Sequence, residues 1–126
     1  LFSLSSKSTI GILGLTYKPG TNTLRRSMSL SLANLLNKNN VGVKAFDPMI
    51  KEQIKTSSYI KICKTAEELF INTDIVILMT EWPEFLKLPT KKFGKLMKKK
   101  IIIDTKNLLD SSKLIKEGFI YKGIGI

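Results

Sequence analysis

The chain has 126 residues, and its 43% apolar and 25% charged residues are typical of a globular protein that buries one core. It contains no histidine and one cysteine, Cys63. Zinc sites built from cysteine and histidine, histidine-dependent triads and an internal disulfide framework are therefore excluded. The net charge of +11 favours an anionic partner, and no apolar run approaches the roughly 20 residues that span a bilayer.

The beginning of the chain, Leu-Phe-Ser-Leu-Ser-Ser-Lys-Ser, has neither an initial methionine nor the layout of a signal peptide. We expect a piece of a longer protein, with residues 1–7 as a linker.

An apolar, β-branched run at residues 9–15 predicts a buried first strand. Ser27 is a suitable N-cap for a helix that ends by residues 39–40. The apolar side chains that recur at helical spacing are Met28, Leu32, Leu35 and Leu36. Residues 41–46 form the next expected strand, which completes a right-handed βαβ crossover.

The pattern then repeats more loosely. Residues 49–55 are expected to form a short helix and residues 59–62 a short strand. A helix is predicted at 65–71, with Thr65 as its cap. Residues 74–79 are the clearest buried strand in the chain.

The segment from 87 to 100 is rich in lysine and contains no acidic residue. Pro83 suits a helix start, and in a second helix from about Thr90 one apolar stripe would be formed by Phe93, Leu96 and Met97. The lysines at 91, 92, 95, 98 and 99 then fall on the other side. This arrangement is typical of a solvated helix face, and the aromatic and arginine contacts of a nucleic-acid site are missing.

The last third continues the alternation, with a strand at 100–104, a helix from Ser111 or Ser112 to Glu117, and a strand from residue 119. The sequence therefore predicts one Rossmann-like, doubly wound α/β domain with three layers and a mostly parallel sheet. Ligands of such sheets bind beyond the carboxyl ends of the strands. The segments at those ends are 17–25, Asp47, 80–82 and 104–107.

The first crossover does not match a dinucleotide-binding turn. Its glycines, Gly11, Gly14 and Gly20, lack the Gly-x-Gly-x-x-Gly spacing, so this domain is not expected to be the main nicotinamide-binding unit. Asp47 stands where such folds place a ribose-binding acid, but because Pro48 follows it, we favour a turn-capping role.

The two arginines, Arg25 and Arg26, stand side by side in a chain with 19 lysines. A guanidinium group binds two oxygens of a phosphate in a fixed geometry, which a lysine cannot do. The position of Tyr17-Lys18 and Arg25 after the first strand suggests that their side chains meet phosphates.

Residues 14–27, Gly-Leu-Thr-Tyr-Lys-Pro-Gly-Thr-Asn-Thr-Leu-Arg-Arg-Ser, resemble a signature of the C-terminal, UDP-binding domain of the UDP-glucose/GDP-mannose dehydrogenase family. Further matches are Phe-Asp-Pro at 46–48, Thr-Glu-Trp at 80–82 and Asp-Thr-Lys-Asn at 104–107. Four motifs in register at strand ends make the resemblance specific, and it extends from about residue 8 to 120.

The resemblance implies that the parent protein oxidises the C6 hydroxyl of UDP-glucose, or of a related UDP-sugar, to a carboxylate with NAD. Tyr17, Lys18 and Lys106 match positions that contact the substrate, and Arg25 matches an arginine that reaches the NAD. The main NAD site and the catalytic cysteine belong to absent domains, so we expect no catalytic residue and no metal in this fragment. Cys63 is interpreted as a structural thiol.

Three positions depart from the family pattern, namely Thr23, Met28 and Lys106, where the family has Asp, Pro and Arg. Glu81 and Trp82 match it without a role that the sequence reveals. By resemblance the parent is expected to be cytoplasmic and homo-oligomeric, with no nucleic-acid or membrane partner. The alternatives are a lysine-rich nucleic-acid-binding module and a non-catalytic interaction domain.

Overall fold

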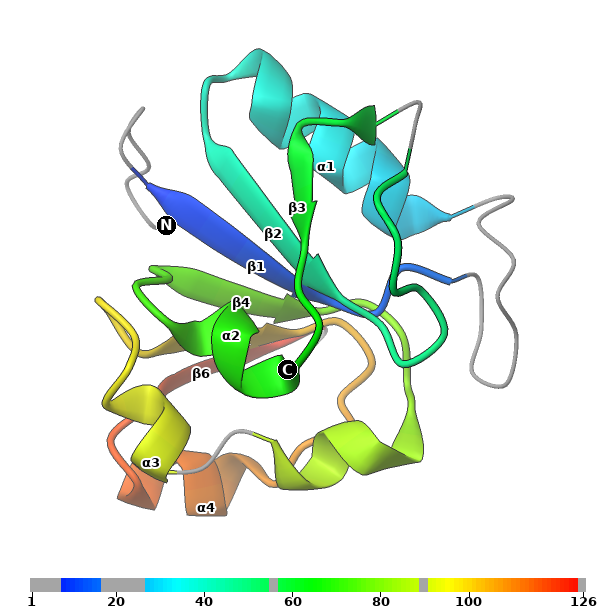
Figure 1. Ribbon diagram of the computed structural model, residues 1–126. Coiled ribbons are helices and arrows are strands. Elements are labelled where there is room, and N and C mark those ends of the chain that lie inside the picture. Colours follow the sequence, from blue (N-terminus) through cyan, green and yellow to red (C-terminus); the bar gives the residue numbers. More distant parts are fainter. Residues whose placement is uncertain (1–7, 17–26, 55–56, 89–90, 125–126) are drawn as a thin grey trace.

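The computed structural model describes residues 8–16, 27–54, 57–88 and 91–124 (Figure 1). Six strands form one sheet in the order β3-β2-β1-β4-β5-β6, and each neighbouring pair is parallel. They are β1 (Thr9–Leu13), β2 (Gly42–Phe46), β3 (Ile60–Ile62), β4 (Ile75–Leu78), β5 (Ile101–Asp104) and β6 (Ile120–Gly123). The strand order reverses between β1 and β4, which confirms the predicted doubly wound fold.

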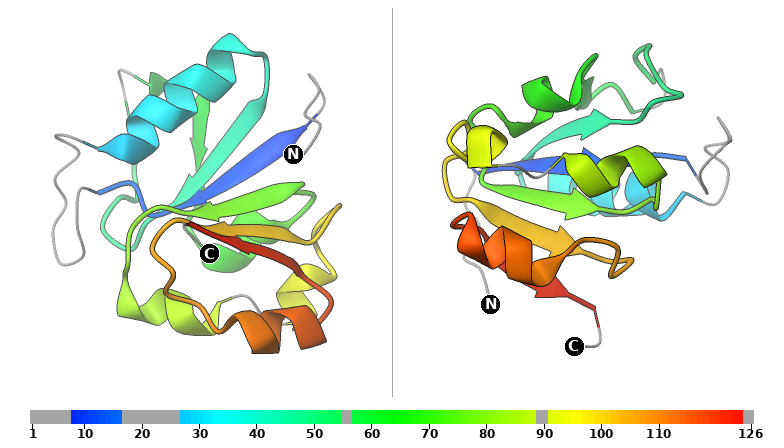
Figure 2. Two further views of the ribbon diagram at one scale, coloured as in Figure 1. Left: turned by 180° about the vertical axis from the view of Figure 1, so that it is seen from behind. Right: turned by 90° about the horizontal axis from the view of Figure 1, so that it is seen from below.

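Helices cover both faces of the sheet, so the molecule has three layers (Figure 2). They are α1 (Met28–Lys38), α2 (Ala66–Phe70), the 3-10 helix η2 (Pro83–Lys87), α3 (Lys91–Gly94) and α4 (Ser111–Lys116). Ala33 of α1 packs on one face, in a cluster with Ile10 and Ile12 of β1. The other helices lie on the opposite face, where Phe70, Phe85 and Leu114 share a second cluster.

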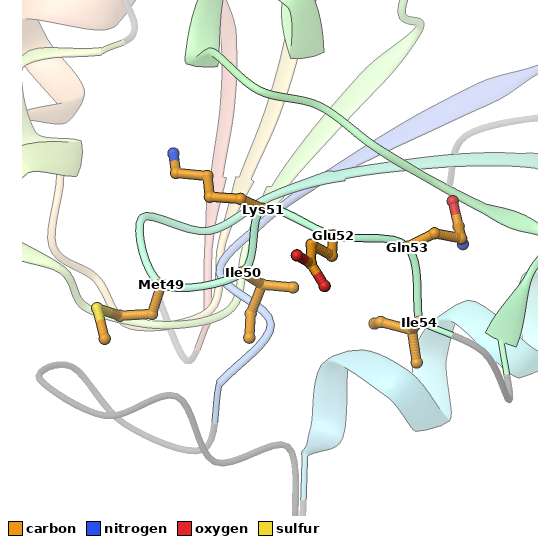
Figure 3. Close-up of a pocket in the computed structure, with 6 residues that line it drawn as sticks. All are labelled: Met49, Ile50, Lys51, Glu52, Gln53 and Ile54. Carbon is orange, nitrogen blue, oxygen red and sulfur yellow. The ribbon is translucent and has the colours of Figure 1, made fainter.

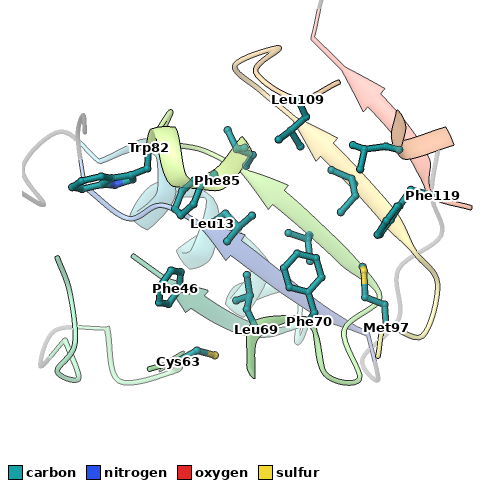
Figure 4. Close-up of a cluster of buried hydrophobic side chains, with 14 residues drawn as sticks. Leu13, Phe46, Cys63, Leu69, Phe70, Trp82, Phe85, Met97, Leu109 and Phe119 are labelled. Carbon is teal, nitrogen blue, oxygen red and sulfur yellow. The ribbon is translucent and has the colours of Figure 1, made fainter. Parts of the chain in front are cut away.

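The second cluster is the larger apolar core (Figure 4). Leu13, Phe46 and Leu78 reach it from neighbouring strands, and Phe70 and Phe85 from the helices above. Because both faces of the central strands are buried, these strands read as continuous apolar runs rather than as alternating ones.

The predicted helix starts are confirmed where a hydroxyl caps them. The Ser27 Oγ accepts a hydrogen bond from the Leu30 amide at 3.2 Å, and the Thr65 Oγ1 accepts one from the Glu68 amide at 3.2 Å. Asp110 caps α4 in the same way, through the amide of Lys113. Local sequence signals therefore fix these helix starts.

The predicted buried face of α1 is partly wrong. Met28 is 71% exposed and Leu35 is 59% exposed, whereas Ser29 and Ala33 are buried against the sheet. Small side chains let the helix axis approach the strands closely, so the buried face is centred on them. Leu32 and Leu36 pack at its borders.

Two other helix predictions need correction. Residues 49–54 are not helical, and an isolated bridge between Asp47 and Ile50 closes a tight turn instead. The lysine-rich helix α3 has four residues and ends at Gly94. A Cβ atom at Gly94 would lie 2.9 Å from the Phe119 ring, so the glycine permits this close packing at the end of the helix.

Candidate functional site

The sequence predicts a site at the carboxyl edge of the sheet, where the parallel strands end. Tyr17, Lys18, Thr23, Arg25 and Arg26 lie outside the described residues. The structure does describe the chain on both sides of that segment. It also describes the exits of β2, β4 and β5, by which we mean the residues that directly follow the carboxyl end of each strand. These surroundings show how the edge is built.

Asp47 joins three strand exits. Its side chain is fully buried, and its Oδ2 accepts hydrogen bonds from the amides of Leu15 at 2.8 Å and Thr16 at 3.1 Å. The same oxygen accepts from the Thr16 hydroxyl at 3.1 Å and, more weakly, from the Trp82 indole nitrogen at 3.4 Å. Its Oδ1 accepts from the Met49 amide at 2.9 Å. One carboxylate therefore fixes the first residues after β1, β2 and β4 relative to one another.

This environment decides between the two interpretations of Asp47. Both oxygens are engaged by donors from the protein, and the side chain has no exposed surface. The Met49 bond closes a turn of the kind that aspartate commonly makes two residues ahead. The turn-capping interpretation is confirmed, and a ribose-binding role for this carboxylate does not fit.

Gly14 and Thr80 bring the exits of β1 and β4 into contact. Gly14 has a φ angle of +98°, and a Cβ atom there would lie 2.4 Å from the Cβ of Thr80. The Thr80 hydroxyl donates to the carbonyl of Thr16 at 2.9 Å. A residue with a side chain at position 14 would clash, which gives the first glycine of the signature a physical reason.

Two serines hold the start of α1 onto the same exit. The Ser27 hydroxyl donates to the Leu15 carbonyl at 2.6 Å, and the Ser29 hydroxyl donates to the Gly14 carbonyl at 2.6 Å. Both serines are buried. The two ends of the signature segment, one after β1 and one before α1, are thus tied together by short hydrogen bonds.

Asp104 organises the exit of β5 in a similar way. It is fully buried, and its Oδ1 accepts from the Lys106 amide at 3.1 Å. Its Oδ2 accepts from the Leu109 amide at 2.8 Å and from the Tyr121 hydroxyl at 2.9 Å. Burial and the hydrogen bond to Asp104 raise the pKa of Tyr121 to about 12, so this hydroxyl stays a donor at neutral pH. The side chain of Lys106 is exposed.

A pocket of about 430 Å³ lies next to these exits, along the segment after β2 (Figure 3). It is lined by Met49, Ile50, Lys51, Glu52, Gln53 and Ile54. The Gln53 amide nitrogen donates to the Ile60 carbonyl at 2.8 Å, which ties this irregular segment to β3. The sequence predicted a helix in this segment, so the pocket was not expected.

Cys63 directly follows β3, so it too lies at the carboxyl edge of the sheet, contrary to the sequence-based placement away from the strand ends, but its side chain is completely buried in the larger core. Burial, with a smaller contribution from Glu68, raises the pKa of its thiol to about 11. A buried, protonated thiol is a poor nucleophile. The structural interpretation of Cys63 is therefore supported.

Within the parts of the chain that the structure describes, no group of three acidic, cysteine or histidine side chains could hold a metal ion. Among the described residues no helix has both the length and the apolar character to cross a bilayer.

The lysines around α3 are exposed, as the sequence predicted, and they lie near the opposite edge of the sheet. The Lys98 amide donates to the Thr73 carbonyl, just before β4 begins, and Lys100 directly precedes β5. This lysine cluster is therefore separate from the strand exits that carry the four motifs.

Two contacts at the carboxyl edge were not foreseen, those of Trp82 with Asp47 and of Tyr121 with Asp104. Trp82 has a role after all, because it covers the sheet end and donates to a buried carboxylate. Glu81 is exposed and has no role that the structure reveals. An aspartate directly after an apolar strand was a usable signal for such a contact, but its aromatic partner was not identifiable.

Comparison with known proteins gives a consistent result. Residues 11–111 match the model of the UDP binding domain of the UDP-glucose/GDP-mannose dehydrogenase family. The chain is 39% identical over 119 residues to a UDP-glucose 6-dehydrogenase of Rickettsia conorii, a match that covers 92% of this chain and 28% of the relative. A UDP-glucose 6-dehydrogenase of Bacillus subtilis is 32% identical over 125 residues, with 93% and 26% covered.

Solved structures agree with the sequence relatives. UDP-D-ManNAc dehydrogenase from Pyrococcus horikoshii matches with a TM-score of 0.76 and 30% identity, covering 95% of this chain and 26% of that one. UDP-glucose dehydrogenase from Pyrobaculum islandicum matches with a TM-score of 0.75 and 26% identity, covering 94% and 26%. The chain thus spans about a quarter of the length of these relatives.

Proposed function

The chain belongs to the UDP-glucose/GDP-mannose dehydrogenase family as its UDP-binding domain, and from this we propose that it binds the nucleotide part of UDP-glucose, or of a related UDP-sugar, within a longer dehydrogenase. The observation that carries the proposal is the coincidence of the four family motifs with the exits of β1, β2, β4 and β5 at one edge of a parallel sheet. That edge is where doubly wound sheets bind ligands.

The residues proposed to contact the nucleotide sugar are Tyr17, Lys18 and Lys106. The diphosphate carries negative charge that the two lysines neutralise, while the tyrosine supplies an aromatic surface. The hydrogen bonds of Asp47 and the two serines support this assignment, because they fix the chain on both sides of the segment that contains Tyr17 and Lys18.

By resemblance, Lys106 stands where many relatives have an arginine. A lysine keeps the positive charge but cannot make a bidentate contact with phosphate. The proposed contact of Lys106 is therefore a single charge-assisted hydrogen bond, in a position where the turn after β5 presents the side chain to solvent.

The parent protein is proposed to oxidise the C6 hydroxyl of the sugar to a carboxylate with NAD as the oxidant. This domain does not fit the main NAD site, because its first turn lacks the glycine spacing and Asp47 has both oxygens engaged. We assign that site, and the catalytic nucleophile, to other domains of the parent, with Arg25 reaching the NAD from this one. The cytoplasmic location and homo-oligomeric state of the parent stay predictions.

Calorimetric titration of the parent protein tests this proposal. We expect UDP and at least one UDP-sugar, UDP-glucose or UDP-N-acetylmannosamine, to bind, and GDP-mannose to bind at least about tenfold more weakly than that UDP-sugar. UMP is the matched control, because it keeps the base and ribose but lacks the diphosphate. Loss of the second phosphate should weaken binding by about tenfold or more, the size of one charge-assisted hydrogen bond. Absence of nucleotide binding would refute the proposal, and a preference for GDP-mannose would refute the assigned substrate.

A further inference from the structure

The turn after β5 is hydrogen-bonded to β6, the last strand of the sheet. The two oxygens of Asp104 accept from the amides of Lys106 and Leu109, so one carboxylate closes the turn from both ends. The Tyr121 hydroxyl of β6 donates to the Oδ2 atom of Asp104 at 2.9 Å. Asp104 has no exposed surface, so this tyrosine is part of how the protein satisfies a buried carboxylate.

A second link joins the same two segments one residue beyond Lys106. Asn107 adopts a left-handed conformation with a φ angle of +51°. Its side-chain amide donates to the Ile124 carbonyl at 2.8 Å, and its Oδ1 accepts from the Ile124 amide at 3.0 Å. The backbone of Lys106 therefore lies between two anchors, and both lead to β6 and the residue that follows it.

These anchors matter for a lysine more than for an arginine. A lysine side chain has many rotamers and one point of contact, so the position of its ammonium group depends on how firmly its backbone is held. A turn that is already ordered before binding loses less conformational entropy when the ligand arrives. Because the residue at this position is a lysine, the support from β6 bears directly on it.

We propose that Tyr121 is a positioning residue for the nucleotide-sugar site, which acts through Asp104 to hold the turn that presents Lys106. The inference rests on the proposed function, because it assumes that Lys106 contacts the ligand. It adds to that function a residue on the outermost strand, which would not itself touch the ligand.

The test is a double-mutant cycle in the parent protein, read by calorimetric titration with UDP-glucose at a temperature where every variant is folded. Tyr121→Phe removes one hydroxyl and should weaken binding by about fivefold, the equivalent of one hydrogen bond. Lys106→Ala should weaken binding by about tenfold, because a charge-assisted bond is lost. The double variant should bind like Lys106→Ala alone, because Tyr121 acts through that lysine.

Two further variants complete the design. Tyr59→Phe is the matched control, because Tyr59 is also partly buried but lies just before β3, near the amino ends of the strands, and it should leave the affinity unchanged. Asn107→Gly keeps the left-handed backbone accessible and removes the amide pair with Ile124. It should weaken binding by a similar factor to Tyr121→Phe, and if Tyr121→Phe fails to fold, it still tests whether support of this turn from the β6 side positions Lys106.

The outcomes distinguish failure of the positioning role of Tyr121 from failure of the proposed function. Weaker binding in Lys106→Ala with unchanged binding in Tyr121→Phe and Asn107→Gly would overturn the positioning role and leave the proposed function standing. Additive losses in the double variant would also overturn it, because they would show an effect that does not pass through Lys106. Unchanged binding in Lys106→Ala would overturn both the inference and the assignment of Lys106 to the ligand.

Discussion

At the scale of single residues, buried aspartates accept hydrogen bonds from the chain at both ends of the strands. Asp47 and Asp104 lie at the carboxyl ends of β2 and β5, and each accepts backbone amides together with an aromatic donor. Asp74 lies at the other edge, where its Oδ2 accepts the Thr9 amide at 2.7 Å. A buried carboxylate is tolerated in these places because donors from the backbone surround it.

The substitution Asp47→Asn should destabilise the protein by about 2–4 kcal/mol, because an amide group would face donors that the carboxylate now accepts. Asp74→Asn is the control at the opposite edge and should cost about 1–2 kcal/mol, since one described hydrogen bond is affected. Urea unfolding measures both values. We propose that Asp47 holds the residues after β1, β2 and β4 together. Equal losses of unfolding free energy in the two variants, together with equal changes in the affinity of the parent for UDP, would contradict this role.

Cys63 should be unreactive toward a thiol reagent at pH 8 while the protein is folded, and reactive once it is unfolded. Burial holds the pKa of this thiol at about 11, whereas an unfolded cysteine ionises near pH 9. Since the unfolded state releases the proton first, stability should fall as the pH rises from about 9 to about 11. Comparison with Cys63→Ala in alkaline unfolding measures this contribution. Rapid labelling of the folded protein would contradict the structural interpretation of the thiol.

At the scale of elements, the sequence predicted what local chemistry determines. Apolar runs identified every strand, and hydroxyl caps identified the starts of α1 and α2, because both signals act within a few residues. The helix expected at 49–55 was wrong, since the turn closed by Asp47 takes its place. Periodicity also misplaced the buried face of α1, because Met28 and Leu35 have helical spacing but Ser29 and Ala33 permit closer packing.

The site was predictable in part for the same reason. Topology alone located the strand exits, and the motifs at those exits named the residues to examine. The contacts of Trp82 with Asp47 and of Tyr121 with Asp104 join residues 35 and 17 positions apart in the sequence. Nothing in a local pattern selects such a partner, since it depends on which strands become neighbours.

Gly14 offers a prediction about the connection between β1 and α1. Gly14→Ala should cost more than about 3 kcal/mol, because the residue has a positive φ angle and its new Cβ would overlap Thr80. Gly42→Ala is the matched control. Gly42 lies in β2 with its nearest contacts at 3.5 Å, so its replacement should change stability by less than about 1 kcal/mol. Equal melting temperatures for the two variants would show that the Gly14 turn is not constrained as described.

At the scale of the whole molecule, the lysines around α3 and the strand ends that carry the family motifs lie at different edges of the sheet. The exposed lysines around α3 lie near the amino ends of the strands, whereas Lys106, the proposed ligand contact that the structure describes, follows the carboxyl end of β5. A net charge of +11 alone would allow a general affinity for polyanions, which falls steeply with salt. The proposed site predicts a different behaviour, because specific side chains at one edge carry the affinity.

Calorimetric titration of the parent protein with UDP, comparing Lys18→Ala with Lys91→Ala, tests the central claim most directly. The two variants lose the same charge, one from the proposed site and one from the exposed lysines around α3. We predict that Lys18→Ala weakens UDP binding by about tenfold or more, the size of a lost charge-assisted hydrogen bond, and that Lys91→Ala leaves it unchanged. Equal losses in both variants, or unchanged binding in Lys18→Ala, would contradict a diphosphate site at the exit of β1.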